Sequence, residues 1–210
     1  MNEENVLKAD AVFEGGGVKG IGLVGAVAVA EAKGYRWNNL AGTSAGAIVA
    51  ALLAAGYTAL ELKAVMEELD YNRFKDAGTL DKVPLAGPLA SLICEKGIYE
   101  GQYLKQWIRG LLQQKGIKTF GDLITEEPGN NKPPRFKLRL IASDISRGRM
   151  LVLPQDIAGF GMRPEDLDVA DAVRMSMSIP FFYEPIKRRN KQTGQASYIV
   201  DGGLLSNFPV

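Results

Sequence analysis

The chain has 210 residues, a length that fits one domain with a sizeable hydrophobic core. Its 25 Lys and Arg residues nearly balance its 24 Asp and Glu residues, so we expect no nucleic-acid partner and no general attraction to an anionic membrane. The longest apolar runs, residues 21–30 and 45–55, are too short to span a bilayer, and residues 1–10 lack the apolar core of a signal peptide.

Two residue types are scarce. The only cysteine, Cys94, excludes an internal disulfide and a cysteine-based metal cluster, which suits a reducing, cytoplasmic location. Histidine is absent, which excludes a Ser-His-Asp triad and the commonest zinc sites. Any serine nucleophile in this chain must therefore use a carboxylate or a lysine as its base.

The first part of the chain alternates strand and helix patterns. Residues 9–14 form a β-rich run that ends at three glycines, and an apolar helical stretch then continues to about residue 33. Residues 35–41 predict a second strand, followed by a helix over 45–56 and another that starts at a capping box at Thr58. This alternation predicts parallel strands with helices packed on the sheet.

The rest of the chain is less regular, and no repeat or linker divides the single domain that we expect over residues 1–210. Residues 71–97 are interrupted by Gly and Pro, and they predict either an irregular packed excursion or a lid. Residues 98–115 predict a helix that buries Tyr103, Trp107 and Leu111. Further elements are expected at residues 135–145 (strand), 150–153 (strand), 168–177 (helix), and 183–189 with 197–200 (hairpin).

The hairpin carries the basic residues Lys187, Arg188, Arg189 and Lys191. The simplest interpretation is a solvated hairpin tip. The alternative is contact with a phospholipid headgroup.

Residues 42–46, Gly-Thr-Ser-Ala-Gly, lie between the second strand and its helix. A serine with glycine two positions away on each side is typical of the nucleophile elbow, where only glycine fits beside the sharp turn. Such a turn presents the Ser44 hydroxyl at a helix N-terminus, whose free N–H groups stabilise negative charge. The same pattern also occurs in ordinary turns, so Gly42, Ser44 and Gly46 are candidates for an elbow.

The glycines of residues 15–20 permit three interpretations. Their spacing satisfies the dinucleotide fingerprint, but the second strand lacks the acidic residue that would hold a ribose. A phosphate loop is disfavoured because no Gly-Lys-Ser/Thr follows. The third interpretation also explains the serine elbow and is therefore favoured: the N–H groups of Gly15, Gly16 and Gly17 hold the oxyanion of an acyl-transfer intermediate.

Asp201 is the first candidate for the base. It ends a predicted strand and precedes two glycines, so its carboxylate could take the Ser44 proton directly. Asp144, also at a strand end, and Asp171 are rival candidates, and Asp-Gly-Gly is in addition a common turn sequence. A dyad with Lys19 is disfavoured because the Ser-x-x-Lys spacing is absent.

Three motifs together resemble those of the patatin-like phospholipases, in the same order. They are Phe-Glu-Gly-Gly-Gly-Val-Lys-Gly at residues 13–20, Gly-Thr-Ser-Ala-Gly-Ala at 42–47 and Asp-Gly-Gly at 201–203. Residues 172–182, and Ala-Ser-Asp at 142–144 followed by Gly-Arg at 148–149, resemble further family segments. The resemblance spans residues 9–209, and the ordered set is far more specific than any one motif.

This resemblance implies an α/β fold, a three-layer α/β/α sandwich with a mainly parallel central sheet. It also implies hydrolysis of the acyl esters of phospholipids or related lipids, with no metal or other cofactor and with peripheral contact to a membrane. Ser44 would be the nucleophile and Asp201 its base. Lys19 would contact the lipid phosphate or cap its loop. The N–H groups that would hold the oxyanion belong to Gly15, Gly16, Gly17 and Ala45.

The C-terminus departs from the family pattern. Family members usually continue well beyond the Asp-Gly-Gly motif, whereas this chain ends seven residues after Gly203, so we expect a catalytic domain truncated at its C-terminus. Two other functions stay open: a non-catalytic lipid- or acyl-binding module that keeps the elbow as architecture, and an acyltransferase that uses the same Ser–Asp pair.

Overall fold

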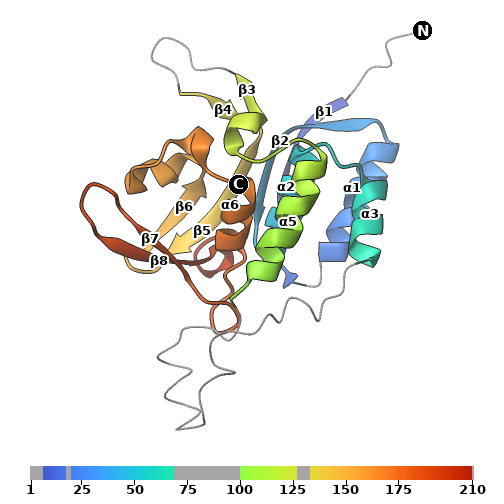
Figure 1. Ribbon diagram of the computed structural model, residues 1–210. Helices are drawn as coiled ribbons and strands as arrows, with labels where there is room; N and C mark the ends of the chain where they lie inside the picture. The colour runs from blue at the N-terminus through green and yellow to red at the C-terminus, as the bar shows by residue number, and fades with distance from the viewer. Residues whose placement is uncertain (1–6, 18–19, 69–99, 127–132, 210) are drawn as a thin grey trace.

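The computed structural model describes residues 7–17, 20–68, 100–126 and 133–209 (Figure 1). Lys19 and the candidate lid at residues 71–97 lie outside these ranges. The elements, with η for a 3-10 helix, are β1 (Leu7–Phe13), α1 (Gly20–Ala32), β2 (Tyr35–Thr43), α2 (Ala45–Ala54), α3 (Ala59–Glu67), α5 (Gln102–Gln114), η4 (Phe120–Leu123), β3 (Ile124–Glu126), β4 (Arg135–Phe136), β5 (Leu138–Asp144), β6 (Arg149–Leu153), η5 (Gln155–Phe160), η6 (Pro164–Asp166), α6 (Val169–Ser176), β7 (Ile186–Arg189), β8 (Ala196–Asp201) and η7 (Gly202–Leu204).

A six-stranded sheet forms the centre of the molecule, in the order β1-β2-β5-β8-β7, with β6 also paired to β5. Strands β1, β2 and β5 are parallel, whereas β6 and β8 run antiparallel to β5, and β7 runs antiparallel to β8. Four of the six strands, β1, β2, β5 and β7, therefore point the same way. The predicted α/β class with a mainly parallel central sheet is confirmed, and a helix layer on each face stays a prediction.

Helix α2 is the central helix of the fold. Its sequence is apolar on every side, and all ten of its residues are buried. It contacts β1, β2 and β5 of the sheet and also helices α1, α5 and α6. Figure 1 shows α5 and α6 packed in front of the sheet, with α1 and α3 side by side near its β1 end. A helix that is apolar all round belongs in such a core.

Helix α5 differs from the prediction in the face that it buries. Leu104, Ile108 and Leu112 are fully buried, whereas the predicted stripe of Tyr103, Trp107 and Leu111 is only half-buried. Both rows have the same four-residue spacing, so periodicity alone could not choose between them. The choice depends on where α6 and α2 pack against α5.

The elbow glycines allow β1, β2 and α2 to approach one another closely. A Cβ atom on Gly42 would lie 2.4 Å from the carbonyl oxygen of Gly46 and 2.8 Å from the nitrogen of Ala47. A Cβ atom on Gly46 would lie 2.3 Å from the carbonyl oxygen of Phe13, at the end of β1. Any larger residue at either position would push α2 away from the sheet.

We expect Gly42→Ala to lower the free energy of unfolding by about 1–3 kcal/mol, because the added methyl group overlaps backbone atoms that cannot turn aside. Gly110→Ala is the matched control: Gly110 lies inside α5 with open space around it, so this change should raise stability by about 1 kcal/mol. Urea unfolding of both variants measures the difference. Equal stability of the two variants would contradict the close approach at the elbow.

Candidate active site

Ser44 lies at the turn between β2 and α2, with φ 54° and ψ −128°. This backbone conformation is strained for a residue with a side chain, and neighbouring contacts hold it in place. The Ser44 N–H donates a hydrogen bond to Ser176 Oγ (3.0 Å), and Ser176 donates in turn to the carbonyl of Ile141 (2.6 Å). Ser44 is 6% exposed. The strained elbow is therefore anchored to both α6 and β5.

Strand β5 brings the ends of two other strands together. Strand β2 runs parallel to β5 and ends with Thr43 opposite Ile141. Strand β8 runs antiparallel to β5 and ends with Asp201 opposite Ala142, the next residue along. Strand β6 occupies the other edge of β5, so β2 and β8 share one edge and meet end to end. This register places Ser44, which follows Thr43, beside Asp201.

Asp201 is held by bonds to its backbone and its side chain. Its N–H donates to the carbonyl of Ser178 (2.9 Å), and its Oδ1 accepts a hydrogen bond from the Gly203 N–H (2.7 Å). A Cβ atom on Gly202 would lie 2.3 Å from the carbonyl oxygen of Ile141, so the strand can turn here only at glycine. The Asp-Gly-Gly motif is therefore a turn, as one interpretation expected, and it also fixes the carboxylate.

The carboxylate of Asp201 is in an unusual electrostatic position. The residue is 6% exposed, and its Oδ2 is buried without a well-aligned hydrogen-bond partner among the described residues. Burial raises the pKa of the Asp201 carboxyl above its ordinary value of 3.8, and hydrogen bonding from the Ser44 hydroxyl and the Gly203 N–H opposes that rise. Burial therefore destabilises the charged form of Asp201, and its Oδ2 can accept a proton.

The Ser44 hydroxyl has two acceptors within reach. It donates a hydrogen bond to the sulfur of Met177 at 3.7 Å, and hydrogen bonding from it also lowers the pKa of Asp201. A thioether sulfur is a weak acceptor, whereas a carboxylate is a strong one. Rotation of the O–H bond from the sulfur toward Asp201 would direct the proton to the stronger acceptor.

The glycine loop packs directly against the serine. A Cβ atom on Gly15 would lie 2.9 Å from Ser44 Cβ, so only glycine permits this contact. The Gly15 N–H, one of the predicted oxyanion donors, donates instead to the backbone carbonyl of Asn207 (3.2 Å), and the Asn207 side chain donates to the Gly15 carbonyl (3.1 Å). Gly16 and Gly17 are exposed beyond it. Ala45 is the first residue of α2, where the helix itself cannot satisfy the N–H.

The rival carboxylates have other partners. Asp144 is fully buried, accepts hydrogen bonds from the N–H groups of Ser146 (3.0 Å) and Arg147 (3.1 Å), and so closes the turn after β5. Asp171 lies on α6 within ion-pair distance of three cations. These are Lys105 (2.5 Å), Arg188 (3.2 Å) and Arg109 (3.6 Å). Asp201 is the carboxylate that the strand register places next to Ser44.

Three residues that contact the elbow or the glycine loop, Ser176, Met177 and Asn207, have no predicted role in the sequence. Ser176 and Met177 lie in the segment 172–182 that resembles a family segment, and Asn207 follows the Asp-Gly-Gly motif. Their contacts join residues that are 132, 133 and 192 positions apart. No local pattern could have indicated them.

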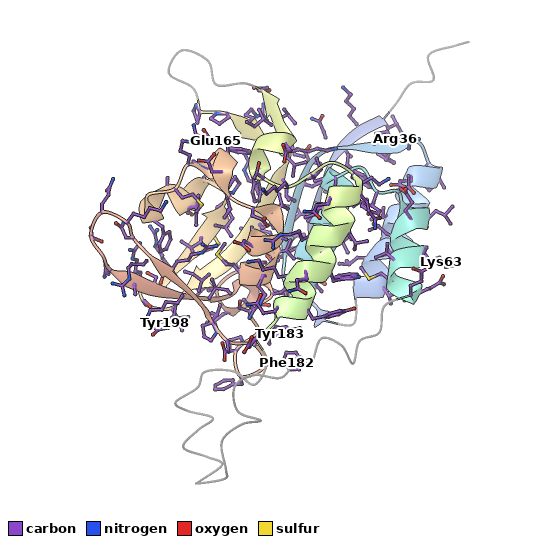
Figure 2. All side chains as sticks on the ribbon, viewed as in Figure 1. Arg36, Lys63, Glu165, Phe182, Tyr183 and Tyr198 are labelled. Atoms are coloured by element: carbon purple, nitrogen blue, oxygen red, sulfur yellow. The ribbon has the colours of Figure 1, made fainter. Side chains whose placement is uncertain are left out.

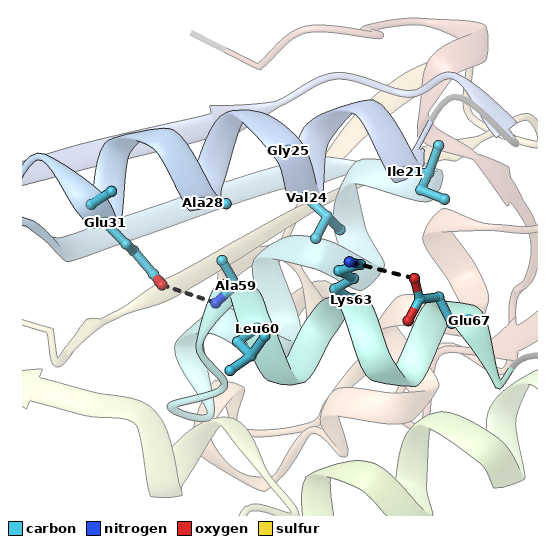
Figure 3. Close-up of a pocket in the computed structure, with 10 residues that line it drawn as sticks. Ile21, Val24, Gly25, Ala28, Glu31, Ala59, Leu60, Lys63 and Glu67 are labelled. Atoms are coloured by element: carbon cyan, nitrogen blue, oxygen red, sulfur yellow. Dashed lines mark hydrogen bonds and ion pairs between the residues drawn. The ribbon is translucent and has the colours of Figure 1, made fainter.

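A groove of about 510 Å³ lies between α1 and α3, and the residues that line it are mainly apolar (Figure 3). Two polar contacts border the groove: Glu31 accepts from the Ala59 N–H (2.9 Å), and Lys63 lies 3.7 Å from Glu67. Neither Ser44 nor Asp201 lines it. Within the described ranges, no group of three or more acidic or cysteine side chains is placed to hold a metal, and no helix is long and apolar enough to cross a membrane.

A serine at a strained elbow, beside a buried carboxylate and a glycine loop, is typical of enzymes that transfer acyl groups through a covalent intermediate. The model of the patatin-like phospholipases matches residues 11–210. The chain belongs to the patatin-like phospholipase family.

The chain is also similar to individual proteins. The uncharacterized protein YqhO of Bacillus subtilis (strain 168) is 48% identical over 202 residues, which are 96% of this chain and 65% of YqhO. The probable lipid hydrolase 463L of Invertebrate iridescent virus 6 is 26% identical over 199 residues, which are 95% of this chain and 61% of that protein. The crystal structure of VipD from Legionella pneumophila shares the fold, with a TM-score of 0.57 and 18% identity over 99% of this chain and 47% of VipD. The chain thus spans less than two thirds of each relative.

The raised pKa of Asp201 has a consequence for stability. An acid whose pKa is higher in the folded than in the unfolded state destabilises the fold when it is charged, so the penalty is complete only above the raised pKa and vanishes below the ordinary pKa of 3.8. We expect Asp201→Asn to be more stable than the wild type at neutral pH, because asparagine is uncharged and keeps an acceptor for the Gly203 N–H. Thermal unfolding over a pH series should show this gap closing as the pH falls. A gap that is absent at neutral pH, or that widens in acid, would contradict the burial of a charged carboxylate.

Proposed function

We propose that this protein is a lipid acyl hydrolase of the phospholipase A type, with Ser44 as nucleophile and Asp201 as its base. The observation that carries the proposal is the meeting of β2 and β8 on one edge of β5, which sets the Ser44 hydroxyl beside a buried carboxylate. Membership of the patatin-like phospholipase family supports a lipid ester as the substrate. The name of the viral relative, a probable lipid hydrolase, is in accord with it.

In the first half of the proposed reaction, Ser44 Oγ attacks the ester carbonyl carbon while Asp201 accepts the hydroxyl proton. The negative charge that develops on the carbonyl oxygen faces the N-terminus of α2, where the Ala45 N–H and the helix dipole favour it. When the intermediate collapses, the ester C–O bond breaks and the departing lysolipid or alcohol takes the proton back from Asp201. The acyl group is then bonded to Ser44.

In the second half, water attacks the acyl-enzyme and Asp201 again accepts a proton. The fatty acid leaves, and the proton returns to Ser44 Oγ. A base with a raised pKa suits this cycle, because it must both accept and release the proton. An alcohol that replaced water in this step would make the protein an acyltransferase.

The N–H groups of Gly16, Gly17 and Ala45 are the proposed oxyanion donors. The Gly15 N–H is bonded to Asn207 in the structure, so Gly15 is proposed to position the loop against Ser44 instead. Lys19 keeps its candidate role as a contact for the lipid phosphate. Peripheral contact with a membrane also belongs to this proposal, since the substrate resides in a lipid layer.

We expect a fluorophosphonate probe to label Ser44, and Ser44→Ala to reduce ester hydrolysis to background. Asp201→Asn should lower kcat by about 10²–10⁴-fold, because it removes the general base. Asp144→Asn is the matched control, since it neutralises another buried aspartate at a strand end and should retain most activity. Mass spectrometry of the adduct and initial rates on a short-chain ester give the readouts.

Three results would contradict the assignment. Absence of a label on Ser44 in a folded sample would remove the acyl-enzyme and leave a lipid-binding module. Equal activity of Asp201→Asn and the wild type would remove Asp201 as base. Transfer of the acyl group to an added alcohol in preference to water would indicate an acyltransferase.

The raised pKa of Asp201 also predicts the pH dependence of the reaction. The base must be ionised, so kcat/KM should fall on the acid side as Asp201 is protonated, and the midpoint of this fall should lie above 3.8. Initial rates on a short-chain ester over a pH series test this. A midpoint at or below the ordinary aspartate pKa would contradict a buried base.

A further inference from the structure

The segment that follows α6, residues 177–183, begins beside the candidate site and continues to the surface. Its sequence, Met-Ser-Ile-Pro-Phe-Phe-Tyr, contains no charged residue. Met177 contacts the Ser44 hydroxyl, and the carbonyl of Ser178 accepts the hydrogen bond from the Asp201 N–H. The segment is therefore apolar in composition and directly joined to both proposed catalytic residues. Figure 2 labels Phe182 and Tyr183, which lie at the end of the molecule beyond the start of α5.

Phe181 is the unusual residue of this segment. Its φ is 66°, and within the described ranges it and Ser44 are the non-glycine residues with positive φ. The left-handed region is unfavourable for a bulky side chain, and Phe181 is 71% exposed as well. The strained backbone disfavours folding, and the exposed ring contributes no burial to offset that cost. Such a combination indicates a function that the folded chain serves at the expense of stability.

Arg174 holds the segment at both of its ends. Its buried guanidinium donates to Ser178 Oγ (2.5 Å) near the start of the segment and to the carbonyl of Glu184 (2.9 Å) just beyond its end. A further bond goes to the carbonyl of Glu100 (2.6 Å), before α5. The guanidinium also lies over the ring of Tyr183, 4.8 Å from its centre. The exposed ring of Phe181 is thus presented by a firmly supported loop.

A second uncharged segment adjoins the first. Residues 202–209, which follow Asp201, contain no charged residue. The bond between Asp201 and Ser178 joins the two segments. The second segment also has exposed apolar side chains, on Leu204, Leu205 and Phe208. Both segments, residues 177–183 and 202–209, therefore carry exposed apolar side chains.

We propose that Phe181 is an anchor that docks the protein onto a lipid surface, with its ring inserted among the hydrocarbon chains. The inference rests on the proposed function, since it places the mouth of the same site against the layer that contains the substrate. The apolar composition of both segments favours hydrocarbon over charged headgroups as the contact.

The basic hairpin, the alternative membrane contact, is less suited to this role. Arg188 is paired with Asp171 (3.2 Å), and Arg189 donates to the carbonyl of Gly194 (2.9 Å). Lys187 lies over the ring of Tyr198, 5.9 Å from its centre. Three of its four cations thus have partners within the fold, which leaves less of the hairpin's charge for lipid headgroups.

The test compares two exposed apolar residues on different parts of the surface. Phe181→Asn removes the ring and keeps a residue that tolerates positive φ, so the fold should be at least as stable. Phe181→Leu keeps an apolar anchor. Leu60→Gln is the matched control, since Leu60 is 77% exposed on α3. Each protein is measured for binding to phosphatidylcholine vesicles, for hydrolysis of those vesicles, and for kcat/KM on a soluble short-chain ester.

We expect Phe181→Asn to bind the vesicles about tenfold more weakly, as the loss of one buried aromatic ring implies, and to hydrolyse them correspondingly more slowly. Its kcat/KM on the soluble ester should stay within about twofold of the wild type, because the ring touches no reacting atom. Phe181→Leu should retain most of the vesicle binding, and Leu60→Gln should match the wild type. Vesicle binding should persist when the salt is raised from about 0.1 M to about 1 M, where charge interactions are screened.

Several outcomes would overturn the anchor. They are unchanged vesicle binding by Phe181→Asn, an equal loss on the soluble ester, and wild-type binding that requires anionic lipid and disappears in high salt. A wild type that hydrolyses the soluble ester but binds no vesicle would also overturn it, while the proposed function would stand. Conversely, Phe181-dependent binding without any hydrolysis would support the anchor and overturn the proposed function.

Discussion

The pairing of β2 and β8 along one edge of β5 is the constraint on which the candidate site depends. One strand arrives parallel and the other antiparallel, and their last residues face Ile141 and Ala142. The backbone hydrogen bonds of the sheet therefore fix the positions of Ser44 and Asp201 along β5 to within one residue. Long flexible side chains are not needed to bridge the two groups. A sheet register is rigid because a slip of one residue would turn every side chain to the opposite face.

This placement has an energetic consequence. Asp201 is buried beside the elbow, and the resulting loss of solvation raises its pKa, while the Gly203 N–H and the Ser44 hydroxyl recover part of that loss. Ser44 is itself strained, and Ser176 holds it through a hydrogen bond to its N–H. Both candidate catalytic residues are thus less favourable for folding than ordinary residues would be. The buried α2 and its contacts to the sheet provide the stability that sustains them.

The segment between α6 and β7 connects this chemistry to the surface. Met177 touches the serine, Ser178 holds the backbone of Asp201, and Phe181 projects into solvent. Arg174 supports the whole segment from within the core. Few covalent and hydrogen bonds therefore separate the exposed ring of Phe181 from the proposed catalytic pair.

The sequence by itself determined the features that depend on neighbours along the chain. These are the apolar α2, the Thr58–Glu61 capping box and the glycines that the elbow requires at residues 42 and 46. The missing histidines also limited the base to a carboxylate or a lysine, and the ordered motifs indicated the family. Only the tertiary structure decided which aspartate lies beside Ser44, which face α5 buries, and that Asn207 engages the Gly15 N–H. The reason is that these contacts join distant residues, and their geometry depends on strand register and helix packing rather than on local spacing.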